Sequence, residues 1–290
     1  MKIAIITHPL NAYAPTRLKE EAEKKGCQLL VFDFSDLKLI LNEDKIDWGI
    51  WLKGKPIEDF DYFVFRGTGD VYSKLRDYVI EYALKRGVGV LNLETYRSWP
   101  CFDKLTQTAI FKLKAIPFVP TKVYGNKDDF RGGFGELPVI VKAASGSHGD
   151  HVYKIESREE AEAVLEKYPV LSLLVQPFLA GGEDLRVIVL GGEIIGAIKR
   201  VAAPGKFLTN YSAGGRVEKY DIDKDQEAVE LALKINSVVK TEYCGIDLMR
   251  GEDRRWKVLE VNRSAQFEGF EKATGINMAA KIINYIETKK

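Results

Sequence analysis

The strongest constraint on the fold is the alternation of short apolar runs with amphipathic segments along the first hundred residues. Gly26 and Gly87 follow two segments of helical spacing, as glycine often does at helix C-termini. The predicted strands are residues 2–7, 29–34, 60–65 and 89–93, and the predicted helices are 15–25 and 72–86. Strands separated by helices in this way predict a parallel sheet covered by helices.

The rest of the chain predicts antiparallel pairing as well. Strands 185–190 and 193–201 flank the two-residue turn Gly191-Gly192, and strands 244–250 and 256–263 flank a polar turn. Further strands are expected at 137–144, 152–155 and 173–178, and helices at 105–113, from Ser157, at 225–240 and at 277–287. The fold class is therefore α/β with an α+β part.

Composition excludes several functional classes. The 290 residues carry 43 Lys and Arg against 42 Asp and Glu, a net charge of +1. This balance argues against a nucleic-acid or membrane-surface partner. The apolar run at the N-terminus is too short for a membrane span. Three widely separated cysteines, with no C-x-x-C pair, indicate a reducing, cytoplasmic location.

The most informative site is the hairpin formed by 244–250 and 256–263. If Arg250 pairs with Lys257, Asp247 falls directly opposite Glu260. Asn262 then shares a face with Glu260, because side chains alternate along a strand. Two facing carboxylates repel each other unless a cation neutralises them, and oxygen donors of this kind suit Mg²⁺. The alternative is a pair of edge carboxylates matched by Arg or Lys.

Two further segments indicate anion binding. The loop 145–149 is rich in small residues, and Lys142 precedes it at the end of a buried strand, where an ammonium needs an anionic partner. Arg200, Lys206 and Asn210 cluster around a glycine-rich stretch. A plain turn and a solvated basic loop are the simpler interpretations of these two segments.

The order of these features resembles the ATP-grasp fold, and most closely the RimK-like group of ATP-dependent carboxylate–amine ligases. The most specific match is L-E-V-N-R-S at 259–264, followed by E-G-F-E-K-A-T-G-I-N at 268–277. The resemblance implies a pre-ATP-grasp α/β domain with a parallel sheet at 1–98. It also implies a two-lobed ATP-grasp fold, with a central lobe carrying the phosphate loop at 99–179 and a C-terminal lobe carrying the metal site at 180–290.

The resemblance also implies site residues. Two lysines would contact the phosphates, a four-residue hinge would contact adenine through its backbone, and Asp184, or alternatively Glu183, would contact the ribose. The implied ATP-binding residues are Lys104, Lys142, Ser145, Gly146, Ser147, Gln176, Pro177, Phe178, Leu179, Glu183, Asp184, Thr209 and Asn210. Arg200 resembles the catalytic arginine that steadies the transferred phosphoryl group.

Asp247, Glu260 and Asn262 match the metal ligands of the group. The implied cofactors are ATP and one or two Mg²⁺ ions, with Mn²⁺ as a substitute. Phosphoryl transfer needs charge neutralisation and positioning more than covalent help, and this requirement fits a set of acids and cations.

Three positions depart from the pattern of the group. His151 stands where the last glycine of the phosphate loop is expected, and a surface histidine is the simpler expectation for it. Ala213 replaces a customary loop arginine, and Arg216 is a candidate to substitute for it. The run S-A-Q at 264–266 replaces S-P-G and would alter the acceptor pocket.

The implied reaction forms an acyl phosphate from a carboxylate and ATP, and an amine then displaces phosphate to give an amide. The expected amine is an amino acid, with glutamate favoured, and the acceptor carboxylate is on a small molecule, peptide or carrier protein. A homo-oligomer is expected by analogy. Two alternatives remain: a kinase of the same fold that phosphorylates a small-molecule hydroxyl, and a nucleotide-binding regulatory module without turnover.

Overall fold

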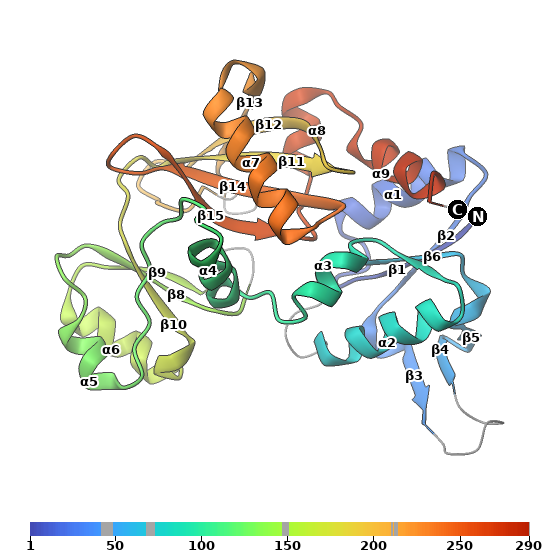
Figure 1. The fold of residues 1–290 in the computed structure, drawn as a ribbon, viewed down its shortest axis with the longest axis horizontal. Helices are drawn as coiled ribbons and strands as arrows, with labels where there is room; N and C mark the ends of the chain where they lie inside the picture. Colours follow the sequence, from blue (N-terminus) through green and yellow to red (C-terminus); the bar gives the residue numbers. More distant parts are fainter. Residues whose placement is uncertain (42–48, 68–72, 147–150, 210, 212–213, 290) are drawn as a thin grey trace.

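The computed structural model describes residues 1–41, 49–67, 73–146, 151–209, 211 and 214–289 (Figure 1). The N-terminal part contains the parallel sheet that the sequence predicts, and its strand order is β2-β1-β6-β7. Its strands are β1 Lys2–Ile6, β2 Gln28–Phe32, β6 Tyr62–Phe65 and β7 Gly89–Val90.

The helices of this part are α1 Tyr13–Lys24, α2 Ser73–Lys85 and α3 Leu93–Ser98. α1 buries Ala14, Leu18 and Ala22, whose spacing gives one apolar face. Gly26 follows with a φ of 69°, the left-handed conformation that glycine adopts at least cost. A small antiparallel sheet of β3 Leu37–Ile40, β4 Gly49–Leu52 and β5 Lys55–Pro56 was not predicted.

The central part holds a separate antiparallel sheet in the order β10-β8-β9. Its strands are β8 Val139–Ala143, β9 Val152–Ile155 and β10 Leu173–Pro177, and its helices are α4 Lys104–Leu113, α5 Lys127–Gly132 and α6 Arg158–Lys167. The Ser157 side chain caps α6 by accepting a hydrogen bond from the Glu160 N–H at 3.2 Å. Phe130, Val141 and Leu173 belong to a core of its own.

The C-terminal part is built on an antiparallel sheet in the order β13-β12-β11-β14-β15. Its strands are β11 Glu183–Leu190, β12 Glu193–Val201, β13 Arg216–Tyr220, β14 Tyr243–Arg250 and β15 Trp256–Asn262. Its helices are α7 Gln226–Val239, α8 Glu268–Thr274 and α9 Met278–Glu287. Leu190 pairs with Glu193 across the predicted two-residue turn.

The register of β14 and β15 confirms one pairing and corrects another. Asp247 lies opposite Glu260 as predicted, but Arg250 pairs with Trp256 rather than with Lys257. The register shifts between Asp247 and Leu248, where Leu259 is an extra residue in β15. The bulge changes the pairing near the turn and leaves the acidic pair in register.

Two buried side chains join the N-terminal and C-terminal parts. Arg66 donates from Nη2 to the carbonyl oxygens of Ser264 and Ala265 at 3.0 and 2.9 Å. Asn92 donates to the Tyr243 carbonyl at 2.9 Å and accepts from the Tyr243 N–H at 2.8 Å. One apolar core spans both parts. In the described residues, no helix has the length and apolar character needed to span a membrane.

Candidate active site

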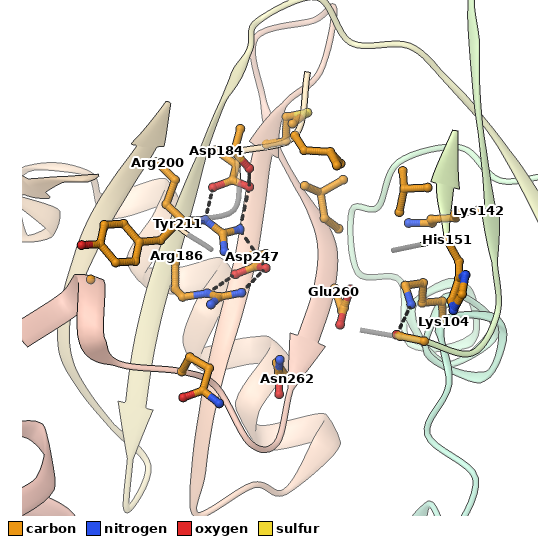
Figure 2. Close-up of a pocket in the computed structure, with 18 of the residues that line it drawn as sticks. Lys104, Lys142, His151, Asp184, Arg186, Arg200, Tyr211, Asp247, Glu260 and Asn262 are labelled. Atoms are coloured by element: carbon orange, nitrogen blue, oxygen red, sulfur yellow. Dashed lines mark hydrogen bonds and ion pairs between the residues drawn. The ribbon is translucent and has the colours of Figure 1, made fainter. Parts of the chain in front are cut away.

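A cavity of about 610 Å³ lies where the three parts meet. Its walls include residues after β1, the end of β8, the segment after β10, and the facing strands β11, β12, β14 and β15 (Figure 2). Most of the predicted site residues line it: Lys104, Lys142, Gly146, Gln176, Pro177, Phe178, Leu179, Asp184, Arg200, Thr209, Asp247, Glu260 and Asn262.

Four predicted residues are not among this lining. Ser145 is half-buried beside the cavity. Glu183 pairs instead with Lys199 at 3.4 Å, and its side chain is 52% exposed. Ser147 and Asn210 lie outside the described residues, as does Ala213. Their expected contacts with the nucleotide stay predictions.

The acidic hairpin presents its donors to the cavity. Asp247 is buried, while Glu260 and Asn262 are half-buried. The Asn262 Oδ1 accepts a hydrogen bond from the Ser264 N–H at 2.8 Å, which fixes the side chain above the following loop. No cluster of three or more His, Cys, Asp or Glu side chains suited to a metal ion is found in the described part of the chain. Two carboxylates and an amide are still an adequate set for Mg²⁺, which usually keeps waters and shares phosphate oxygens.

Asp247 is held by two arginines. Arg186 donates to its two carboxylate oxygens from Nε and Nη2, each at 2.7 Å, and Nη2 of Arg200 lies 2.9 Å from its Oδ2. Burial acts against the charged form, yet the two guanidiniums hold the pKa of Asp247 below its ordinary value. The carboxylate is therefore ionised and already neutralised by protein groups.

Asp184 has a role that the sequence did not reveal. Arg200 donates to both of its carboxylate oxygens at 2.6 Å, and the Thr209 hydroxyl donates to one of them at 2.6 Å. The residue is only 4% exposed. Its oxygens thus orient Arg200, while the expected ribose contact stays a prediction.

The two lysines lie across the cavity from these arginines (Figure 2). Burial lowers the pKa of Lys142 to about 8; Glu260 acts in the opposite direction, and Lys104 lowers it further. The described residues provide no ion pair within 4 Å for the Lys142 ammonium. Lys104, at the start of α4, donates to the Gly146 carbonyl at 2.8 Å. An anionic ligand would stabilise the charged form of the buried Lys142 amine.

His151 is not the surface residue that the sequence suggested. It is half-buried, lines the cavity, and its Nδ1 lies 2.7 Å from the Tyr168 hydroxyl. Gly146 has a φ of 115°, and a Cβ there would lie 2.5 Å from the His151 ring. Arg216 is different, because its side chain is 72% exposed and pairs with Glu218 at 2.9 Å.

The hinge predicted at 176–179 forms an apolar end of the cavity. The Gln176 side chain donates to the Thr121 hydroxyl at 2.7 Å. The Phe178 ring contacts Phe207 edge-on, with ring centroids 6.5 Å apart, and the Lys154 ammonium lies 4.7 Å from its centroid. A flat aromatic wall of this kind suits a planar base.

The specific motif at 268–277 forms a joint between parts of the fold. Glu271 accepts hydrogen bonds from the Tyr13 hydroxyl at 2.6 Å and from Arg17 Nε at 3.4 Å, both on α1. Gly275 ends α8 with a φ of 72°, and Asn277 caps α9 by accepting from the Ala280 N–H at 2.9 Å. The motif therefore stabilises the junction of α1 with α8 and α9.

Sequence reasoning missed Arg186, which lines the cavity and binds Asp247. The sequence position of Arg186 could have indicated a place in the site, because Arg186 lies two residues after Asp184 and so shares its face of β11. Its partner could not be identified without the pairing of β11 with β14, a contact between residues far apart in the chain.

The fold and the cavity define an ATP-grasp protein, and the comparisons agree. A RimK PreATP-grasp domain model matches residues 1–81, and a RimK-like ATP-grasp domain model matches residues 103–286. The chain belongs to the RimK-like ATP-grasp family.

Curated relatives are similar over nearly the whole chain. A "Probable alpha-L-glutamate ligase" of Aliivibrio fischeri (strain MJ11) is 32% identical over 294 residues, which cover 99% of this chain and 95% of the relative. A "Probable alpha-L-glutamate ligase 1" of Hahella chejuensis (strain KCTC 2396) is 32% identical over 296 residues, covering 100% and 95%. The chain is accordingly an ATP-dependent carboxylate–amine ligase, and the kinase and the regulatory module receive no support.

Solved structures share the fold. The ATP-grasp ligase PsnB, complexed with a phosphomimetic variant of its minimal precursor, Mg and ADP, has a TM-score of 0.72 at 20% identity, covering 99% of this chain and 98% of that one. The D-cycloserine synthetase DcsG has a TM-score of 0.70 at 18% identity, covering 100% and 99%. Both show the ATP-grasp architecture.

Proposed function

We propose that the enzyme joins the amine of an amino acid, with glutamate favoured, to a carboxylate acceptor at the cavity between the three parts. The observation that carries this proposal is that oxygen donors suited to a metal ion and lysine ammonium groups face each other across that cavity, with Arg186 and Arg200 on the side of the acids. Oxygen donors from Asp247, Glu260 and Asn262 stand on one side, and the ammonium groups of Lys104 and Lys142 stand on the other (Figure 2).

The donor set fits Mg²⁺. Asp247, Glu260 and Asn262 supply only oxygen ligands, which are the ligands that Mg²⁺ and Mn²⁺ prefer. One or two Mg²⁺ ions held by these residues would neutralise the negative charge of the phosphates. We extend the proposal to Mn²⁺ as a substitute.

The side chains of the protein position the phosphates and the reacting groups. Lys142, buried and charged below a pKa of about 8, is suited to a phosphate oxygen, and Lys104 lies beside the described end of the phosphate loop. Arg200, oriented by Asp184, is suited to the transferred phosphoryl group. A carboxylate oxygen attacks the γ-phosphorus and ADP leaves; the amine then attacks the carbonyl carbon and phosphate leaves.

The preference for glutamate rests on the relatives, which are named probable alpha-L-glutamate ligases. The acceptor proposal rests on neighbours crystallised with precursor peptides, such as PsnB and MdnC. An acceptor on a peptide, a carrier protein or a small molecule is consistent with the size of the cavity, about 610 Å³.

The test is an assay of ADP release over a panel of amino acids and carboxylate acceptors, with amide products identified by mass spectrometry. ADP release that requires both an amino acid and a carboxylate, with a mass gain of one residue, supports the proposal. Stimulation by no amino acid would refute it. Glu260→Ala should abolish turnover, whereas Glu252→Ala, in the exposed turn of the same hairpin, should not.

Two cellular features are also proposals. The free cysteines Cys27, Cys101 and Cys244 fit a reducing cytoplasm, which fractionation would test. A homo-oligomer is proposed by analogy, and light scattering of the purified protein would detect it.

A further inference from the structure

A row of alternating charges crosses the strands β12, β11 and β14 on the cavity side. Asp184 of β11 pairs with Arg200 of β12, and Arg186 of β11 pairs with Asp247 of β14. The contact of 2.9 Å between Arg200 and Asp247 joins the two pairs. The row therefore begins with an acid, Asp184, and ends with a cation, Arg186.

The two arginines differ in how their donors are used. A guanidinium has a side edge, formed by Nε and Nη2, and an end edge, formed by Nη1 and Nη2. Arg200 uses its side edge for Asp184 and directs Nη2 to Asp247 as well. Arg186 uses its side edge for Asp247, and Nη1 has no hydrogen-bond partner within the described part of the chain. Its end edge is open for a second carboxylate.

The direction of that open edge is fixed. Asp247 holds the guanidinium plane through two bonds of 2.7 Å, and the Arg186 stem lies over Gly245, where a Cβ would come within 3.4 Å of Nε. The side chain is 13% exposed and lines the cavity. Figure 2 shows Asp247 on one side of the guanidinium and Asn262 on the other.

Among the Lys and Arg side chains of the described lining, only Arg186 has an open edge at that end of the cavity. Lys104 and Lys142 lie across it, and Arg200 is held by two acids. The described lining toward the N-terminal part includes Thr7, Tyr13, Gln266 and Glu268, and also His8, whose Nδ1 lies 2.8 Å from Asp33 Oδ2. An anion bound beside Asn262 therefore has Arg186 as its cationic partner.

We propose that the end edge of Arg186 binds the substrate carboxylate that ATP activates, which extends the alternating row by one anion. This proposal rests on the proposed function. Arg186 holds the carboxylate beside Asn262 while one carboxylate oxygen forms its bond to the γ-phosphorus. The bond from that phosphorus to the departing ADP oxygen breaks in the same step, and its electron pair leaves with ADP.

The test compares Arg186→Gln and Arg186→Lys with the wild type. The probes are N-acetyl-L-glutamate, N-acetyl-L-glutamyl-L-glutamate and a peptide with a C-terminal glutamate, each assayed with ATP and an amino acid. We expect Arg186→Gln to raise the KM of the carboxylate by at least about tenfold, the scale of one lost charge-assisted pair. The affinity for Mg-ADP, measured by calorimetry, should not weaken.

Arg186→Lys separates binding from a structural role. Lysine restores a positive charge beside Asp247 but has no second planar edge, so the carboxylate KM should stay raised. Lys199→Gln, on the neighbouring strand and outside the cavity lining, is the matched control and should leave the KM unchanged.

The outcomes distinguish this proposal from the function on which it rests. Wild-type turnover with an unchanged carboxylate KM in Arg186→Gln would refute the role of Arg186 alone. So would equal weakening of carboxylate and Mg-ADP binding, or full rescue by lysine. If Arg186→Gln fails to fold, the carboxylate KM of Arg186→Lys decides. Failure of the wild type with every carboxylate would refute the proposed function, and this inference with it.

Discussion

Replacing Asp184 with asparagine tests whether this residue orients Arg200 or contacts the nucleotide. The carboxylate is 4% exposed and accepts three hydrogen bonds at 2.6 Å, two of them from Arg200. Asparagine keeps the shape but removes the charge, so Arg200 retains only Asp247 as an ionic partner. Breaking a buried pair costs about 3–5 kcal/mol, and we expect about 3 kcal/mol because Asp247 compensates in part.

Urea unfolding measures this loss directly. With a slope of about 3 kcal/mol per molar urea, a loss of about 3 kcal/mol moves the midpoint down by about 1 M. Asp221→Asn is the control, since Asp221 forms an exposed pair with Lys224 and should change stability by less than about 0.5 kcal/mol. An unchanged midpoint for Asp184→Asn, together with a lost preference for ATP over 2′-deoxy-ATP, would refute the orienting role and favour a ribose contact.

Three further predictions concern a titration and two joints in the fold. Burial lowers the pKa of Lys142 to about 8, so its ammonium loses a proton as the pH rises through that value. The kcat/KM for ATP should therefore fall through about pH 8. The Lys142→Gln variant should not show this fall. Glu271→Gln removes the negative charge that accepts hydrogen bonds from Tyr13 and Arg17, and it should lower the free energy of unfolding, measured by calorimetry, by roughly 2 kcal/mol. Glu23→Gln is the control, because Glu23 belongs to an exposed ion pair and its loss should not have this effect. Gly245→Ala would place a Cβ 2.7 Å from that of Ala265 and should lower the free energy of unfolding by about 1–3 kcal/mol. Adding Ala265→Gly should restore part of this stability. Purely additive effects of the two substitutions would contradict the contact.

The sequence predicted the larger elements because their signals are local. The parallel sheet follows from apolar runs closed by Gly26 and Gly87, and the hairpin 185–201 follows from its two-residue turn. The small sheet of β3, β4 and β5 was missed although Lys53 and Gly54, both with positive φ, form a two-residue turn between β4 and β5; its strands of four, four and two residues are too short to show a clear apolar pattern. Local patterns therefore gave the elements that combine a turn or helix-end signal with an apolar run long enough to recognise.

The site was only partly predictable, because its electrostatics depend on contacts between distant strands. Asp247 and Glu260 were paired correctly from an incorrect assumption about Arg250, since the bulge at Leu259 lies between the turn and the acids. The bonds of Arg186 to Asp247 require the register of β11 against β14, which no local pattern specifies. Residue types and positions were thus accessible from the sequence, whereas their partners were not.

The core shared by the N-terminal and C-terminal parts keeps the acids and arginines of the cavity in place. The C-terminal sheet and the N-terminal sheet share one apolar core, and Arg66 and Asn92 hold the loop after Asn262 against the N-terminal part. The arginines and acids of the cavity are therefore ordered before any ligand arrives. A ligand therefore loses less of its binding free energy to ordering this side of the cavity.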